Sequence, residues 1–229
     1  MEQDFDPSGY DPGAYDRPSV AVDCVAIGIV DGEPAVLLIR RDQPPFAGHW
    51  ALPGGFVAID ESLEAAAVRV LRDKAKIGDM PVEQVHCFGA VDRDPRMRII
   101  AIAYRALLSP VRTRALRLTV GECLARIGAD GRLYHDGQPI ALAFDHDVIV
   151  AHTLARLRDA IDDAAFALVP CRFTLRELQQ VHEAVLGQPL NKPAFRRRML
   201  ERGGLRGTGD FEGGRAFRPA ELYVQLPKD

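Results

Sequence analysis

Apolar positions in the first half of the chain follow the short runs of β-strands, interrupted by one helical segment. SVAVDCVAIGIV and AVLLIRR are rich in Val and Ile and are separated by Asp-Gly, which predicts strand, turn and strand over residues 19–41. Asp60 or Ser62 is suited to begin a helix that runs through three alanines to about Lys76. Further strands are predicted over residues 84–90 and 99–108, and residues 147–161 have the spacing of a helix. Strands interrupted by helices predict an α/β body.

The pattern changes after Pro170 to helix, turn, helix and hairpin. Thr174 and Glu177 have the spacing of a capping box, and Leu175 and Leu178 begin an apolar helical face. Asn191 is suited to begin the second helix, which Gly203-Gly204 ends. Residues 205–214 and 215–224 then predict a hairpin with a glycine-rich tip. This order resembles a winged helix-turn-helix.

Three segments follow from these patterns. Residues 1–18 hold three prolines, two glycines and no apolar periodicity, which predicts a mobile arm. Residues 19–165 form the predicted α/β body, and residues 166–229 form the winged domain. The expected fold class of the whole chain is α+β.

Composition fits an ordinary globular protein, with 47% hydrophobic and 27% charged residues among 229. No apolar run approaches the roughly 18 residues of a membrane span, so we expect no membrane contact. The four cysteines form no Cys-x-x-Cys pair, which favours reduced thiols in a cytoplasmic protein over a disulfide frame or zinc site. The chain carries a net charge of −3, but residues 170–229 hold eleven Lys or Arg against seven Asp or Glu. This basic tail favours a polyanionic partner, although a chance excess on a solvated face is the alternative.

A glycine-rich turn precedes the first predicted helix and is suited to bind an anion. Backbone N–H groups at such turns bind phosphate, which glycine allows to approach closely. Carboxylates three and four residues apart on the helix would share one face and hold divalent cations against a diphosphate. The spacing of Gly55, Glu61 and Arg69 resembles the Nudix box, G-x5-E-x7-R-E-U-x-E-E-x-G-U, in which U is apolar.

The chain departs from this box at four positions. Val70, Asp73, Lys74 and Lys76 stand where the box has Glu, Glu, Glu and Gly. Only Asp73 keeps the charge of a metal-binding carboxylate, and Lys74 adds a positive charge that repels a divalent metal. We therefore expect a Nudix-like α/β/α sandwich with a mixed sheet, no metal site and no catalytic residues.

Side chains near the box suit a nucleotide that is bound but not hydrolysed. Arginine forks match diphosphate oxygens, which makes Arg41 and the turn of Arg93 and Arg96 candidates, with a solvated loop as the alternative for the turn. Trp50 or Phe88 could stack on a base or belong to the core. The predicted effector-binding residues are Arg41, Trp50, Gly54, Gly55, Glu61, Arg69, Phe88, Arg93 and Arg96.

The second helix of the tail, NKPAFRRRMLERGG, carries basic residues beside an apolar edge. A helix fits the major groove of DNA, where arginines contact phosphates and bases. The hairpin that follows fits a wing on the DNA backbone, although a winged domain that binds protein or forms dimers is the alternative. The predicted DNA-binding residues are Thr174, Arg176, Lys192, Arg196, Arg197, Arg198 and Arg215.

The two domains together resemble one family, the Nudix-related transcriptional regulators of NAD metabolism, or NrtR family. The shared features are W-x-L-P-G-G, the turn from Arg93 to Arg96, the segment from Phe144 to His146, and NKPAFRRRM. The resemblance implies a homodimeric repressor that binds a palindromic operator in double-stranded DNA. It also implies that ADP-ribose, or an NAD-related nucleotide, binds the Nudix domain as an effector. No cofactor is expected to be required.

Two other functions stay open from the sequence. The chain could be a hydrolase of ADP-ribose or of another nucleoside diphosphate derivative, but Val70 and Lys74 argue against it. It could instead be an inactive adaptor that binds proteins, but the basic cluster from Lys192 to Arg198 argues against that. His146 could carry a proton or serve as a structural hydrogen-bonding group.

Overall fold

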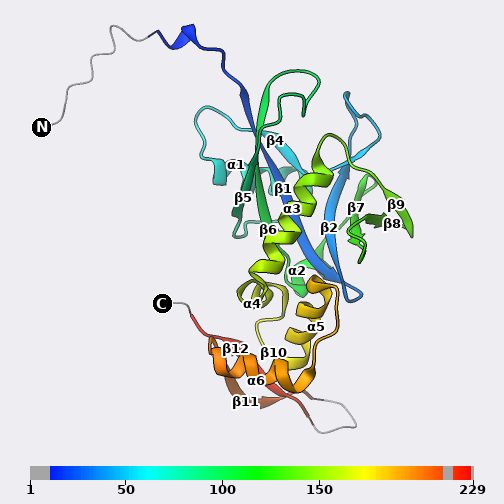
Figure 1. Ribbon diagram of the computed structural model, residues 1–229, viewed down its shortest axis with the longest axis vertical. Coiled ribbons are helices and arrows are strands. Elements are labelled where there is room, and N and C mark those ends of the chain that lie inside the picture. The colour runs from blue at the N-terminus through cyan, green and yellow to red at the C-terminus, as the bar shows by residue number, and fades with distance from the viewer. Residues whose placement is uncertain (1–10, 214–218, 228–229) are drawn as a thin grey trace, which may run out of the picture.

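The two Val- and Ile-rich segments form the centre of a mixed sheet in the computed structural model, which describes residues 11–213 and 219–227 (Figure 1). The strands of this sheet are β1 (Ser19–Val30), β2 (Glu33–Arg40), β3 (Trp50–Ala51), β4 (Gly54–Phe56), β5 (Glu83–Phe88), β6 (Ile99–Leu107), β7 (Glu122–Ile127), β8 (Leu133–His135) and β9 (Gln138–Ile140). The main path runs β5-β6-β1-β2-β7-β8-β9, with β3 beside β2 and β4 beside β1. β1 and β6 are parallel and β1 and β2 antiparallel, so the predicted mixed sheet is confirmed.

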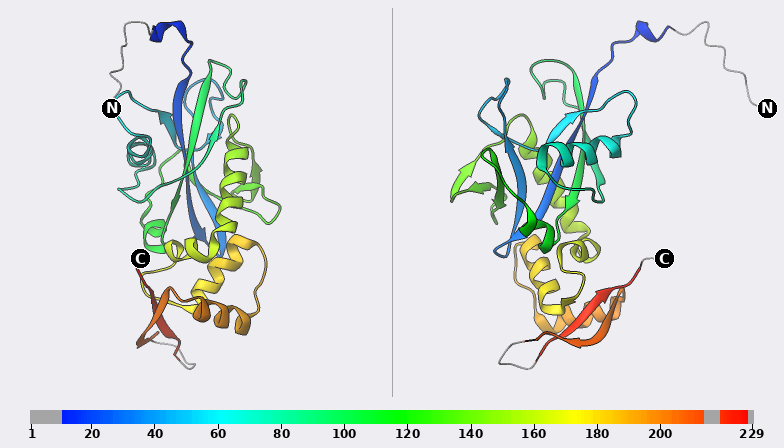
Figure 2. Two further views of the ribbon diagram at one scale, coloured as in Figure 1. Left: turned by 60° about the vertical axis from the view of Figure 1, so that its left-hand side comes forward. Right: turned by 180° about the vertical axis from the view of Figure 1, so that it is seen from behind.

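Alternate residues of β1 enter two separate cores, because successive side chains of a strand point to opposite faces. Val22 and Cys24 pack with α1 (Leu63–Ala75), whereas Val25 and Ile27 pack with α3 (His146–Asp159). Figure 2 shows the result, with α1 and α3 on opposite faces of the sheet. This is the α/β/α sandwich that the sequence predicts.

Helix α1 begins at a side-chain cap and ends at a residue with a left-handed backbone conformation. The Ser62 hydroxyl accepts a hydrogen bond from Ala65 N, so Ser62 is the N-cap and Asp60 is not. Lys76 ends the helix in the left-handed region, with φ of 54°. Glycine adopts this conformation without strain, which accounts for the Gly of the Nudix box at this position.

Several short elements were not predicted. They are η2 (Pro12–Ala14), α2 (Pro110–Ala115), α4 (Ile161–Ala164) and η3 (Ala165–Leu168). The helix expected over 147–161 ends at Asp159, and α4 begins after Ala160. Each of these elements is at most six residues long, too short for an apolar period to repeat.

The winged domain has the predicted order, with one additional strand. Its elements are β10 (Phe173–Thr174), α5 (Leu175–Leu186), α6 (Lys192–Arg202), β11 (Leu205–Phe211) and β12 (Glu221–Gln225). The capping box of Thr174 and Glu177 is confirmed, and Asn191 caps α6 by accepting from Ala194 N. The fold class and both domain types predicted above are thus confirmed.

One apolar cluster extends from the sheet into the winged domain. It includes Val36 and Leu38 of β2, Leu178 of α5 and Phe195 of α6. The two domains therefore share a core, and the domain boundary between residues 165 and 166 stays a prediction. Residues 1–10 of the predicted arm lie outside the described residues. Within the described ranges, no helix is long and apolar enough to cross a membrane.

Candidate functional site

A cavity of about 590 Å³ opens between strands of the sheet, among them β1 and β4, the C-terminal part of α1 and several loops. Its walls come from segments that are far apart in the sequence, including the 93–96 turn and the loop before α3. Five of the nine predicted effector-binding residues line it, namely Arg41, Gly54, Gly55, Arg93 and Arg96. The sheet and α1 thus bring the glycine-rich turn and the arginines together, as the sequence predicts.

The other four predicted residues do not line this cavity. Trp50 packs edge-on against His135 at 5.2 Å, and Phe88 packs edge-on against His86 at 5.2 Å. Both rings border the core cluster, so the core interpretation of these aromatics is the one that the geometry supports. Glu61 and Arg69 form an ion pair of 2.5 Å with each other.

That ion pair serves the fold of the box. Glu61 also accepts from Ala58 N at 2.8 Å, while Arg69 donates to Phe56 O at 3.0 Å. The hydrogen bond from Arg69, followed by that from Ala58 N, lowers the pKa of Glu61 to about 2. The pair thus fixes the loop between β4 and α1. Both side chains of the pair are held by these bonds, and neither is among the residues that line the cavity.

Neighbouring side chains approach Gly54 and Gly55 closely and leave little room for a Cβ at either position. A Cβ at Gly54 would collide with the Asp23 carboxylate, and one at Gly55 would lie 3.1 Å from Val70 Cγ2. Val70 is buried, at 1% exposed, because it packs beneath this turn. An apolar side chain therefore fills the helix position where the Nudix box has a carboxylate.

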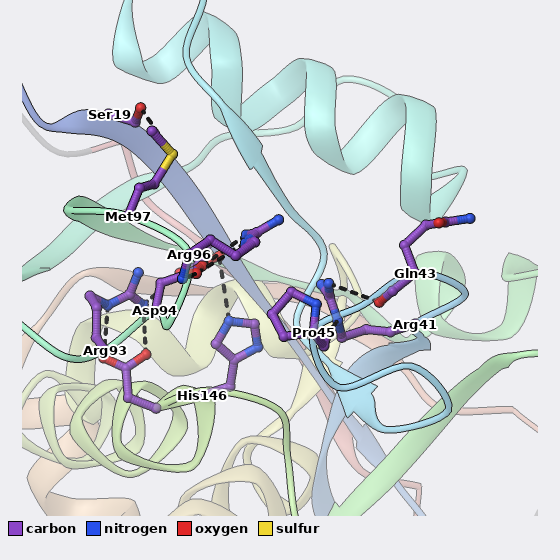
Figure 3. A network of polar contacts seen from close by, with 11 residues as sticks. Ser19, Arg41, Gln43, Pro45, Arg93, Asp94, Arg96, Met97 and His146 are labelled. Atoms are coloured by element: carbon purple, nitrogen blue, oxygen red, sulfur yellow. Dashed lines mark hydrogen bonds and ion pairs between the residues drawn. The ribbon is translucent and has the colours of Figure 1, made fainter.

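Arg93 is buried between two carboxylates (Figure 3). Its guanidinium bonds Asp145 at 2.6 and 2.9 Å and Asp23 at 3.3 Å, and its side chain is only 5% exposed. Burial alone would lower the pKa of Arg93, but the hydrogen bonds and charges of Asp145 and Asp23 raise it. Arg93 thus joins β1 to the start of α3 rather than standing free for an anion.

Arg96 and Arg41 flank the ring of Phe144. The Arg41 guanidinium carbon lies 4.7 Å from the ring centroid, and that of Arg96 lies 5.9 Å from it. Arg96 bonds Asp94 through two nitrogens, whereas Arg41, among the described residues, bonds only the backbone oxygens of Pro45 and Gln43 (Figure 3). Burial, and then the charge of Arg96, lower the pKa of Arg41.

His146 is a structural hydrogen-bonding group at the base of the cavity. Its Nδ1 accepts from Leu52 N at 3.0 Å, so the ring proton lies on Nε2, which faces Asp23 at 3.7 Å. Burial lowers the pKa of His146, although Asp23 and Asp145 act in the opposite direction. The ring is therefore neutral at pH 7 and joins β3 to α3.

The winged domain presents a second basic surface. A groove of about 670 Å³ between α5, α6 and the β-strands is lined by four of the predicted DNA-binding residues, namely Thr174, Arg176, Lys192 and Arg196. Two carboxylates, those of Glu212 and Glu221, also line it. The Arg196 guanidinium also bonds the Tyr223 hydroxyl at 3.3 Å. Phe195 and Met199 are buried, which turns the basic residues of α6 toward solvent.

The remaining predicted DNA-binding residues differ in availability. Thr174 is only 4% exposed, and its hydroxyl bonds both the backbone and the side chain of Glu177, so this hydroxyl is engaged in the capping box. Arg197 is exposed and, within the described ranges, has no ion pair. Arg198 pairs with Asp162 of α4 at 3.2 Å but stays half exposed. Arg215 lies outside the described residues.

Comparison with known proteins matches both halves of the chain. Residues 18–116 match the NUDIX domain family, and residues 165–224 match the family described as the NrtR DNA-binding winged helix domain. A relative from Acinetobacter baylyi, the ADPR responsive transcriptional repressor NtrR, is 36% identical over 218 residues, which cover 93% of this chain and 84% of the relative. The chain belongs to the NrtR family.

Solved NrtR structures extend the comparison to three dimensions. NrtR of Shewanella oneidensis is 34% identical, with a TM-score of 0.76 over 90% of this chain and 94% of that one. The same protein in complex with a 27mer DNA gives 31% identity and a TM-score of 0.73 over 90% and 93%. Its NUDIX domain with ADP ribose gives 29% identity and a TM-score of 0.51 over 66% and 95%.

An enzyme is also related to the N-terminal half of this NrtR-family chain. The ADP-ribose pyrophosphatase of Methanocaldococcus jannaschii is 34% identical over 137 residues, which cover 59% of this chain and 73% of the enzyme. The Nudix fold is thus shared by a regulator and a hydrolase. The fold alone therefore does not decide between the two activities.

Sequence reasoning missed the acidic partners of the cavity in this NrtR-family chain. Asp23, Asp94 and Asp145 hold the arginines, and none was among the predicted residues. One signal was available, because Asp23 lies inside an apolar strand, where a charge is buried only with a partner. Asp145 and Asp94 lie in loops and carry no such signal.

Proposed function

We propose that this chain is a transcriptional repressor of genes for NAD biosynthesis or salvage, whose affinity for operator DNA changes when ADP-ribose binds the Nudix domain. The observation that carries the proposal is the set of cations Arg176, Lys192 and Arg196, which line a groove together with Glu212 and Glu221 on a winged domain of the NrtR type. Three cations on one concave surface suit the phosphates of double-stranded DNA. A homodimer is part of the proposal, because two copies of the chain related by twofold symmetry would bind the two halves of a palindromic operator.

ADP-ribose is the proposed effector because the cavity offers cations for a diphosphate. Arg40 and Arg41 line the cavity, and both bond backbone carbonyl oxygens rather than carboxylates. The names of the Acinetobacter and Shewanella relatives, which respond to or bind ADP-ribose, support the same ligand. No cofactor is included in the proposal.

Helix α3 provides a physical link between the cavity and the recognition helix. Its first turn holds the cavity through Asp145 and His146. After Ala160 the chain continues into α4, where Asp162 pairs with Arg198 and Asp163 with Arg202 of α6. A ligand that shifts the start of α3 would therefore change the position of α6. An effector acts only through a difference in affinity between two such states.

Hydrolysis of ADP-ribose is the second candidate, favoured by the relationship to a pyrophosphatase. Against it, Asp73 is 54% exposed and pairs with Arg72, and Lys74 and Val70 replace the neighbouring carboxylates. A Nudix enzyme needs such carboxylates to hold metal ions against the diphosphate. We infer that the effector is bound and released intact.

One experiment separates the two candidates. Fluorescence anisotropy would measure binding of the full chain to promoter fragments of the host's NAD-synthesis genes, with and without ADP-ribose, at fixed salt and with Mg²⁺. Salt is fixed because phosphate contacts make the affinity steeply salt-dependent. The proposal expects tight binding that ADP-ribose weakens, while chromatography finds the nucleotide unchanged. Absence of DNA binding together with consumption of ADP-ribose would favour the hydrolase.

A further inference from the structure

The cations that line the cavity fall into two groups. Arg93 and Arg96 bond carboxylates, and their charge is neutralised within the protein. Arg40, Arg41 and Lys74 instead bond backbone carbonyl oxygens, which carry no net charge. Within the described residues, no carboxylate lies within ion-pair distance of these three cations. They are the positive charges that an anion in the cavity would meet.

Lys74 is distinctive because it enters the cavity from the box helix. Its ammonium donates a hydrogen bond to Gly54 O, across the gap between α1 and β4. A Cβ on Gly55 would lie 4.0 Å from Lys74 Nζ, so the ammonium also borders the second glycine of the turn. The side chain is thus fixed at the place where the glycine-rich turn exposes its backbone to the cavity.

The residues around Lys74 do not fit a divalent metal ion. Magnesium prefers six oxygen ligands, with carboxylates among them. Val70 offers no oxygen, Asp73 pairs with Arg72 at 3.0 Å, and the Gly54 carbonyl is already occupied by the ammonium. The described part of the chain contains no group of three or more His, Cys, Asp or Glu side chains that could hold a metal. The metal that the Nudix fold implies therefore has no site here.

We propose that the Lys74 ammonium replaces that metal and binds the effector's diphosphate together with Arg41, so that nucleotide binding needs no divalent cation. This inference rests on the proposed function, because it assumes that ADP-ribose is the effector. An ammonium and a guanidinium supply two positive charges to a diphosphate, which carries two negative ones. An ammonium does not lower the pKa of a bound water as a metal does, so it binds the diphosphate without generating a hydroxide to cleave it.

Isothermal titration calorimetry of the full chain with ADP-ribose tests the inference, once with excess EDTA and once with Mg²⁺. The wild type is expected to bind with the same Kd in both buffers. Lys74→Met is expected to raise the Kd by roughly 10- to 100-fold, as for the loss of a hydrogen bond to a charged group. Lys74→Arg keeps the charge and is expected to stay within a few-fold of wild type.

Lys76→Met is the matched control, because Lys76 lies two residues away and its ammonium bonds Asp73 O outside the cavity. It is expected to leave the Kd unchanged, and thermal unfolding of each variant shows whether the fold is retained. Three results would overturn the inference: wild-type binding that requires Mg²⁺, a Lys74→Met Kd equal to wild type, or equal losses in Lys74→Met and Lys74→Arg. If the wild type binds no ADP-ribose in either buffer, the proposed effector itself is overturned, and the inference with it.

Discussion

The cavity and helix α6 are both basic, but their cations are held differently. In the cavity, Arg93 lies between two carboxylates and is 5% exposed, and Arg96 bonds Asp94. On α6, Arg196 and Arg197 are exposed, and Arg198 pairs with a single carboxylate at 3.2 Å. A buried arginine with two carboxylates organises its own domain, whereas an exposed arginine is available to a partner. The number of basic residues in a region therefore does not say how many can bind an anion.

The strongest test of this contrast is Arg93→Met. It would leave Asp23 and Asp145 without their common partner in a buried site. Removal of one member of a buried ion pair destabilises a protein by about 3–5 kcal/mol, and we expect that loss in the free energy of unfolding by urea. Arg98→Met is the control, because Arg98 is exposed and bonds the carbonyls of Gly89 and Ala90 rather than a carboxylate in the described part of the chain. An Arg93 variant within 1 kcal/mol of the control, on the order of a typical surface change, would contradict a structural role.

The exposed arginines of α6 should show the opposite behaviour. Arg196→Ala with Arg197→Ala is expected to weaken operator binding by about 100-fold or more, because each contact to phosphate or base contributes on the order of 1–3 kcal/mol. ADP-ribose affinity and unfolding should be unchanged, since neither side chain is buried. Anisotropy with labelled DNA measures the operator affinity, and calorimetry measures the ADP-ribose affinity. Arg126→Ala, at an exposed ion pair of the Nudix domain, is the control. DNA binding equal to that of the control would refute α6 as the recognition helix.

The same contrast explains what the sequence could predict. Helix α6 is one continuous segment, and its cap at Asn191, its buried Phe195 and its basic residues follow from local spacing. The Nudix sandwich was predicted equally well, because long strands and α1 have strong periodicity and the box fixes the order of the turn. These features depend on neighbours in the chain, so a single sequence contains them.

The cavity depends on contacts between distant segments, which spacing does not encode. Arg93 meets Asp145 across 52 residues and Asp23 across 70, and only the folded sheet brings them together. Glu61 and Arg69 were assigned to the ligand because the box contains them, yet they bond each other. Thr174 likewise was predicted to bind DNA, although the capping box, also predicted, uses its hydroxyl. A residue type suited to a ligand is equally suited to a partner within the protein.

The neutral His146 gives the cavity a dependence on pH. Burial lowers its pKa in the folded chain from the usual value of 6.5. The unfolded chain therefore takes up a proton below pH 6.5 that the folded chain refuses, and stability is lost as the pH falls through that value. His146→Gln should reduce this loss by up to about 1.4 kcal/mol per pH unit, as urea unfolding between pH 6.5 and 5.5 would show. His49→Gln, at an exposed position, should retain the full slope; equal slopes in both variants would refute the assignment.

The smallest expected effect concerns the link between the two regions. Asp162→Asn keeps a hydrogen-bond acceptor beside His182 but removes the charge that holds Arg198. A half-exposed ion pair contributes on the order of 1 kcal/mol or less, so the ratio of DNA affinities without and with ADP-ribose should move toward one by at most about fivefold. Both separate affinities should change less than in the α6 variant. Arg72→Gln removes an exposed pair with Asp73 on α1 and should leave the ratio unchanged. If Asp162→Asn also leaves it unchanged, the coupling does not pass through the contact between α4 and α6, and α3 would have to act on the winged domain through the apolar core that the two domains share.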